Sequence, residues 1–348
     1  MFNINNTQLT KVSVHHVGNK NNGEDLEISK TILDVNEEGL NERLKHFFLK
    51  SFDAVELYHF TSSNQDFILN PLFQFARDVF SLQADFHFSS INFAKHLYEN
   101  SNHPNIKSGD LFVAFFHDME IGHKIVDAIG IFKSENKQSF FKLEKNGQQF
   151  NLHSEIGINP DKLDKGCLIF DLDEDQGYQI CITDKANKAG EAQFWKDQFL
   201  NLRPCKDEFH QTKNFLSIAK NYLTTAIIQD FELEKTDQID LLNRSVDYFK
   251  NRDHFEKDEF EQEVFQDPKV IDSFRRFETQ YKQEHQIEQE DSFDISLAAV
   301  KKQTKIFKSI LKLDKNFHIY IHGNKEMIEK GTEKDGRKYY KIYYQNED

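Results

Sequence analysis

The 348-residue sequence is poor in residues that constrain a backbone, with three cysteines, five prolines and 14 glycines. Cys167, Cys181 and Cys205 form no closely spaced pair and leave an odd number, so the sequence predicts neither a disulfide framework nor a zinc site. We expect them to be small buried apolar residues. With 38% hydrophobic and 29% charged residues, the composition is that of a folded soluble protein rather than a disordered or fibrous one.

Long apolar runs are also missing. No stretch of about 18 consecutive apolar residues occurs, and the N-terminal MFNINNTQLTKV has neither a basic segment nor the apolar core of a secretion signal. The sequence therefore predicts a cytoplasmic protein with no membrane partner.

Motifs of common catalytic sites are absent: there is no Walker loop, dinucleotide fingerprint, HExxH or G-x-S-x-G elbow. The segment DLDEDQG places Asp171, Asp173 and Asp175 at the first three ligand positions of a calcium loop. Its glycine falls one place late, however, and the twelfth position is Ile182 instead of glutamate. A hairpin turn is the favoured interpretation, and the sequence predicts no cofactor, no metal site and no enzymatic activity.

Phenylalanine is abundant, with 34 residues, and we expect it to build the core rather than a binding surface. The alternating run QLTKVSVHHVGN, followed by turn residues and LEIS, predicts a hairpin. Further short β-rich runs predict an antiparallel meander: DLFVAFFHD, HKIVDAIGIFK, QSFFKLEKN, GCLIFDL and GYQICIT.

Helices are predicted after Asn36, from Pro71, and in SSINFAKHLYEN, with Asn36 and either Ser89 or Ser90 as caps. From Asn187 the apolar spacing is mainly helical. The chain ends in two β-like runs around a turn-rich segment that contains Asp335-Gly336, which predicts a terminal hairpin. The predicted fold class is α+β. An N-terminal domain of mixed antiparallel sheet and helices covers residues 1–186, and a mainly helical domain with a small C-terminal β unit covers residues 187–348.

The formal net charge of −14 opposes contact with nucleic acid, but the charge is unevenly distributed. Residues 295–348 hold 12 Lys+Arg against 7 Asp+Glu, whereas residues 1–294 hold 32 against 51. Within the acidic part, residues 229–294 carry 20 Asp+Glu against 9 Lys+Arg and keep helical apolar spacing. The sequence thus predicts acidic-faced helices followed by a basic tail.

Six lysines at the start of this tail form the main candidate for phosphate contact: Lys301, Lys302, Lys305, Lys308, Lys312 and Lys315. On a helix, all of them except Lys302 fall within an arc of about 80°, with apolar residues opposite. Such a row contacts phosphates without base specificity. A solvated helix face is the ordinary alternative, and a strand over part of the run would scatter the row.

A second basic group near the C-terminus consists of Arg337, Lys338 and Lys341. Four tyrosines alternate with it: Tyr339, Tyr340, Tyr343 and Tyr344. Charge that protects an edge strand is the favoured interpretation, and a basic aromatic surface for nucleic acid is the alternative.

Four segments resemble the bacterial nucleoid-associated protein family of the NdpA (YejK) type: QLTKVSVHHV, GDLFVAFFHD, FLNLRPCKDEFHQTKNFL and NFHIYIHGNKEM. The resemblance extends over nearly the whole chain, and EDSFDIS is similar to the family's join between acidic helices and the C-terminal β unit. It implies a DNA-binding protein located in the nucleoid, without an assigned enzymatic activity, that associates with itself. We expect a homodimer. It supplies no family-wide list of binding residues.

The leading hypothesis is therefore a nucleoid-associated, non-enzymatic protein whose basic C-terminal surface contacts the duplex backbone. The alternative is a protein that binds nucleoid or DNA-processing proteins through its acidic helices. A third hypothesis is a metal-dependent nuclease that uses Asp110, Asp118, Glu120 and Asp127, although their spacing matches no ligand template.

Overall fold

The computed structural model describes residues 2–3, 6–37, 39–52, 56–184, 194–304, 310–313, 315–321 and 327–346. The chain forms two compact units, residues 1–205 and residues 206–348, which we call the N-terminal and C-terminal units. The architecture is α+β, as predicted. The predicted domain boundary at 186/187 falls among residues outside the described ranges and stays a prediction.

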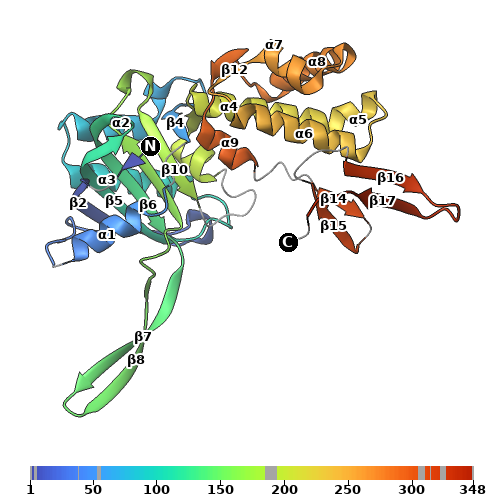
Figure 1. The fold of residues 1–348 in the computed structure, drawn as a ribbon. Coiled ribbons are helices and arrows are strands. Elements are labelled where there is room, and N and C mark those ends of the chain that lie inside the picture. Colours follow the sequence, from blue (N-terminus) through green and yellow to red (C-terminus); the bar gives the residue numbers. More distant parts are fainter. Residues whose placement is uncertain are drawn as a thin grey trace. The chain divides into compact units, whose positions relative to one another are not determined.

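The N-terminal unit is built on one antiparallel sheet with the order β11-β4-β10-β9-β6-β5-β2-β3, and β1 pairs with β5 (Figure 1). The strands of this sheet are β1 (Phe2–Asn3), β2 (Gln8–Val17), β3 (Leu26–Ile28), β4 (Leu57–Phe60), β5 (Gly109–Ile121), β6 (Lys124–Ser134), β9 (Lys165–Phe170), β10 (Gln179–Asp184) and β11 (Leu202–Pro204). The predicted hairpin of β2 and β3 is confirmed, and so is the turn between β9 and β10, which holds the 3-10 helix η3 (Glu174–Gln176).

Both faces of this sheet are covered. Because side chains alternate along a strand, Leu111 and Val113 of β5 lie in one buried cluster, and Phe112 and Ala114 lie in another. The first cluster includes α2 (Pro71–Phe80), α3 (Phe86–Asn100) and the π-helix η4 (Phe194–Leu200), and the second includes α1 (Leu40–Leu49). Two short 3-10 helices, η1 (Lys20–Asn22) and η2 (Phe67–Leu69), lie in loops.

Helix starts follow local hydrogen bonding, which corrects two predicted caps. The prediction that a helix begins at Pro71 is confirmed, with the side chain of Asn70 accepting from the first-turn amides. Asn36 does not cap α1, because its amide and side chain both bond to Asp34, and the cap is Gly39. The predicted serine caps of α3 are also wrong, because the cap is Asp85; Ser89 and Ser90 lie inside the helix and are buried.

The predicted meander continues past β6 in an unexpected way. Strand β7 (Lys137–Asn146) is present, but it pairs with β8 (Gln149–Ile158) in a separate two-stranded ribbon. Figure 1 shows this ribbon running away from the sheet. In the sheet, the next neighbour of β6 is β9. We call residues 137–158 the arm.

The C-terminal unit is mainly helical. Its helices are α4 (Glu208–Asn221), the π-helix η5 (Tyr222–Ala226), α5 (Ile227–Asp230), α6 (Lys235–Lys250), α7 (Lys257–Phe260), the π-helix η6 (Glu261–Phe265), α8 (Pro268–His285) and α9 (Leu297–Thr304). Strands β12 (His254–Glu256) and β13 (Ser292–Asp294) pair between them. Phenylalanine builds this core as expected: the Phe215 ring contacts Phe249, Phe255 and Phe260.

Two small hairpins end the chain. Strands β14 (Ile310–Leu313) and β15 (Phe317–Tyr320) form one, and β16 (Ile328–Thr332) and β17 (Lys338–Ile342) form the other (Figure 1). The turn at Asp335-Gly336 is confirmed, with Gly336 at a φ of 87°. The prediction of a single terminal hairpin is wrong, because the two predicted β-like runs belong to different hairpins: β15 pairs with β14, and β17 pairs with β16.

All three cysteines are buried, as expected, and burial raises the pKa of the Cys167 thiol. None of the described helices is both long enough and apolar enough to span a bilayer.

Candidate nucleic-acid interface

The predicted lysine row does not form one continuous helical stripe. Helix α9 ends at Thr304, and the chain is a strand again from Ile310. The physical reason is burial: Leu311 of β14 packs in a small cluster with Ile239 of α6 and Ile321. Tertiary packing of the alternating side chains therefore overrides their helical spacing.

The six lysines are accordingly divided among different elements. Lys301 and Lys302 are exposed on α9, and the Lys302 ammonium lies 5.6 Å from the centre of the Phe209 ring. Lys315 is exposed in the turn between β14 and β15. Lys312 lies in β14, with its side chain outside the described part of the structure, and Lys305 and Lys308 lie outside the described residues.

The second basic group lies on the hairpin of β16 and β17, but on both of its faces. Alternation along β17 puts Lys341 on the face opposite Lys338. The Arg337 amide donates to Asp335 Oδ1 at 3.1 Å, and the Arg337 Nε donates to Oδ2 at 2.7 Å. The amide first, and then the side chain, lowers the pKa of the Asp335 carboxyl. The Lys341 ammonium lies 3.6 Å from a carboxylate oxygen of Glu329. Lys338 is exposed and forms no ion pair with a described residue.

A further cation in this hairpin was missed by the sequence analysis. Lys334 is exposed in the turn beside Asp335, and it forms no ion pair with a described residue. Its neighbour Lys330 instead pairs with Glu234 at 3.3 Å and so links the hairpin to the start of α6. The run EKDGRK carried a signal for this site, since a turn with three cations exposes all of them.

The two hairpins together are basic and rich in exposed aromatic rings. The described residues 310–313, 315–321 and 327–346 contain seven Lys+Arg against three Asp+Glu. Large aromatic side chains lie exposed among them: Phe317, Tyr320, Tyr339, Tyr343 and Tyr344. Cations between exposed rings are the combination that binds a nucleic-acid strand through phosphate attraction and stacking.

The acidic helices predicted in the C-terminal unit are present, but many of their carboxylates are paired internally. Glu261 is completely buried and accepts from Arg275, which also pairs with Asp258 at 2.7 Å. Glu278 is also buried, between the ammonium groups of Lys257 at 2.6 Å and Lys282 at 2.7 Å. These pairs leave less negative surface than the composition indicates.

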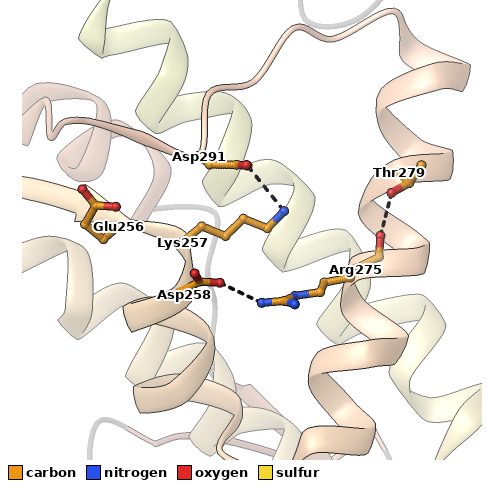
Figure 2. Close-up of a pocket in the computed structure, with 6 residues that line it drawn as sticks. All are labelled: Glu256, Lys257, Asp258, Arg275, Thr279 and Asp291. Carbon is orange, nitrogen blue, oxygen red and sulfur yellow. Dashed lines mark hydrogen bonds and ion pairs between the residues drawn. The ribbon is translucent and has the colours of Figure 1, made fainter.

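A shallow pocket of about 420 Å³ opens on this network and is lined by Glu256, Lys257, Asp258, Arg275, Thr279 and Asp291 (Figure 2). Lys257 lies 3.4 Å from Asp291, and Thr279 donates to the Arg275 carbonyl at 2.8 Å. Glu256 accepts from the Ser292 hydroxyl, which lowers the pKa of its carboxyl. A ligand here would have to displace existing pairs, so the pocket is a weak candidate for a binding site.

The carboxylates of the nuclease hypothesis are not brought together. Asp110 and Glu120 lie at opposite ends of β5. Asp110 pairs with His16 and Lys137, while Asp127 bonds to His117 at 2.8 Å. Over the described residues, no group of three or more His, Cys, Asp or Glu side chains is arranged to hold a metal ion.

Comparison with known families places the chain among nucleoid-associated proteins. A family model described as "Nucleoid-associated protein YejK" matches residues 13–337, which is nearly the whole chain. The protein therefore belongs to this family, and the family resemblance predicted from the sequence is confirmed. No curated protein matches the sequence.

Proposed function

We propose that the protein binds duplex DNA without catalysing a reaction, and that its C-terminal hairpins and the neighbouring lysine run contact the backbone phosphates. The observation that carries the proposal is the excess of seven cations over three carboxylates on hairpins with exposed aromatic rings. This excess is local, because the whole chain has a net charge of −14. Membership of a nucleoid-associated family supports it.

The cations divide by their freedom to reach phosphate. Three of the lysines are exposed and form no ion pair with a described residue: Lys315, Lys334 and Lys338. A phosphate that binds to them displaces water and breaks no ion pair with a described carboxylate. Arg337 and Lys341 would have to exchange a carboxylate for a phosphate, so each would contribute less binding free energy than an unpaired lysine. The remaining proposed contacts come from the lysine run: Lys301, Lys302, Lys305, Lys308 and Lys312.

The test is the salt dependence of duplex binding. Each phosphate contact contributes about 0.9 to the slope of log K against log salt concentration, so replacing Lys315, Lys334 and Lys338 by Gln should reduce the slope by about 2 to 3. Binding to a duplex without a defined site should weaken at least tenfold at low salt. Lys301→Glu with Lys305→Glu and Lys308→Glu tests the lysine run in the same way.

The matched control replaces three exposed lysines of the N-terminal unit, Lys30, Lys95 and Lys162, by Gln. This variant has the same change in net charge and should keep the wild-type slope. An equal loss in both variants would show that overall charge, and not the C-terminal surface, controls binding. The absence of nicking when the protein is incubated with plasmid and Mg²⁺ or Mn²⁺ is the expected result for a non-enzymatic protein.

A second candidate function is binding of nucleoid or DNA-processing proteins through the acidic helices. It is favoured by the 20 Asp+Glu against 9 Lys+Arg in residues 229–294. Partners recovered with the protein after nuclease treatment, together with weak binding to purified DNA, would support it over direct DNA contact. We also propose that the protein acts as a homodimer, so that two weak DNA sites bind together.

A further inference from the structure

The arm has one apolar face that nothing in the described structure covers, apart from Ile158 at its base, which packs against the core of the N-terminal unit. All of β7 and all of β8 except its last two residues are exposed. The register of the two strands puts ten side chains on this face: Lys137, Ser139, Phe141, Leu143 and Lys145 from β7, and Phe150, Leu152, Ser154, Ile156 and Ile158 from β8. We call it the apolar face.

The other face of the arm is mostly polar and charged, and it can remain exposed to solvent. Lys142 lies 2.9 Å from a carboxylate oxygen of Glu144 and 3.3 Å from one of Glu155. The one large apolar residue there, Phe140, lies across Gly157, where a Cβ atom would be only 2.8 Å from the ring. That ring therefore already has a packing partner. Of the apolar side chains opposite, Ile158 packs against the core of the N-terminal unit. The others have no packing partner outside the arm among the described residues: Phe141, Leu143, Phe150, Leu152 and Ile156.

The uncovered area is large enough for a specific interface. Phe141, Leu143, Phe150, Leu152 and Ile156 are 77%, 62%, 63%, 63% and 73% exposed. With roughly 200 Å² for a fully exposed phenylalanine and about 150 Å² for an aliphatic side chain, they expose about 600 Å². That is at the upper end of the largest patches on monomers, which are about 300–600 Å². An isolated two-stranded ribbon is also marginally stable in water, so a partner would stabilise the arm.

The shape of the apolar face identifies the partner as a second copy of the chain. Two of its cross-strand pairs join a large side chain to a small one: Phe141 faces Ser154, and Ile156 faces Ser139. If two arms pack face to face about a two-fold axis along their length, β7 of one lies over β8 of the other. Phe141 of one copy then lies over Ser154 of the second copy, and Ile156 lies over Ser139 of the second copy, so large side chains meet small ones along the interface. Leu143 lies over Leu152 of the second copy.

We propose that two copies of the protein dimerise by packing the apolar faces of their arms together. The two faces would bury up to about 1,200 Å² in total, which reaches the range of specific interfaces at about 1,200–2,000 Å². Within one chain the Lys145 ammonium lies 6.0 Å from the centre of the Phe150 ring. The same axis also places Lys145 over the ring of Phe150 in the second copy, where an ammonium group is favourable. This inference deepens the homodimer of the proposed function and does not depend on DNA contact.

The test measures the mass of the full-length protein by sedimentation equilibrium without DNA. Wild type should sediment at twice the 41.1 kDa of one chain, and Leu152→Asp should raise the dimer dissociation constant at least 100-fold. Asn151→Asp is the matched control: it adds the same charge one residue away on the other face, and should leave the constant within threefold of wild type. Unchanged fluorescence of Trp195, which is buried in the N-terminal unit, shows that both variants are folded.

A cysteine pair supplies a second measurement that does not rely on disruption. The three native cysteines are buried, so Ser154→Cys or Asn151→Cys gives one accessible thiol per chain. A bismaleimide that spans about 10 Å, the spacing of packed sheets, should join two Ser154→Cys chains but not two Asn151→Cys chains. A wild-type monomer at 100 μM, or a dimer that Leu152→Asp leaves intact, would overturn the proposal. Loss of DNA binding by the lysine variants, with the dimer intact, would bear only on the DNA contact.

Discussion

A buried histidine should make the stability of the N-terminal unit depend on pH. His15 of β2 is 2% exposed, and its Nε2 lies 2.9 Å from the Ser90 hydroxyl of α3. Its Nδ1 accepts from the Ser29 amide at 3.3 Å. Because an imidazolium ring has no acceptor, protonation would break the Ser29 bond and bury a charge. Burial, with a smaller contribution from the nearby His87, lowers the pKa of His15 to about 4.

The magnitude follows from the difference between this pKa and the ordinary value of 6.5. Below pH 6.5 the unfolded chain binds a proton that the folded chain does not bind until about pH 4. The free energy of unfolding should therefore fall by about 2 kcal/mol between pH 7 and pH 5, and by about 3 kcal/mol once the pH is below 4. The stabilisation is fully present above pH 6.5.

The assay is urea unfolding followed by fluorescence. The chain has one tryptophan, Trp195, and it is buried in the first cluster of the N-terminal unit, so its emission reports this unit alone. His15→Asn keeps an acceptor near Nδ1 but does not titrate, so the wild type should lose about 2 kcal/mol more than this variant from pH 7 to pH 5. Parallel pH profiles for the two proteins would refute the assignment of a neutral, buried His15.

Three further substitutions test what holds each unit together. Arg275→Ala leaves the buried carboxylate of Glu261 without its cation, and should destabilise the C-terminal unit by about 3 to 5 kcal/mol in urea unfolding followed by circular dichroism. Phe132→Ala removes a ring stacked on Phe48 with a centroid distance of 4.4 Å, and should cost about 3 to 5 kcal/mol by tryptophan fluorescence. Asn70→Ala removes the cap of α2 and the hydrogen bonds to the carbonyls of Thr61 and Leu200, and should cost about 2 kcal/mol by the same assay. A loss below about 0.5 kcal/mol in any of these three variants would contradict the contact that it removes.

Where local chemistry decides the structure, the sequence was sufficient. Pro71 is a favourable first-turn residue, and the start of α2 was predicted from it alone; the structure adds Asn70 as the cap. The β-rich pattern of residues likewise predicted β7, but such a pattern does not determine which other strand β7 pairs with. The pairing with β8 depends on the Asn146–Gln149 turn. Ser89 and Ser90 have the chemistry of caps, yet they lie inside α3 because Asp85 precedes them and takes that role.

The sequence predicted which residues make the C-terminal region basic, but it did not predict how their side chains are arranged in space. The sequence indicated a basic C-terminal region, and the described hairpins are basic. It did not predict that Lys338 and Lys341 would point to opposite faces of β17, because that requires the register with β16. The pairing of Arg337 with Asp335 lies within one turn and was accessible from sequence, whereas the pair of Lys330 with Glu234 joins residues far apart in the chain.

The alternation of β5 between two buried clusters limits how the length of this protein can change. Deleting one residue before Leu111 would exchange the side chains that enter each cluster, so both would be lost together. The turn at the tip of the arm has no such restriction, since the strands on either side of it are exposed. An epitope tag or fluorophore is therefore best inserted between Asn146 and Gln149. Among related proteins, insertions of one or more residues should likewise occur in this turn and not in β5.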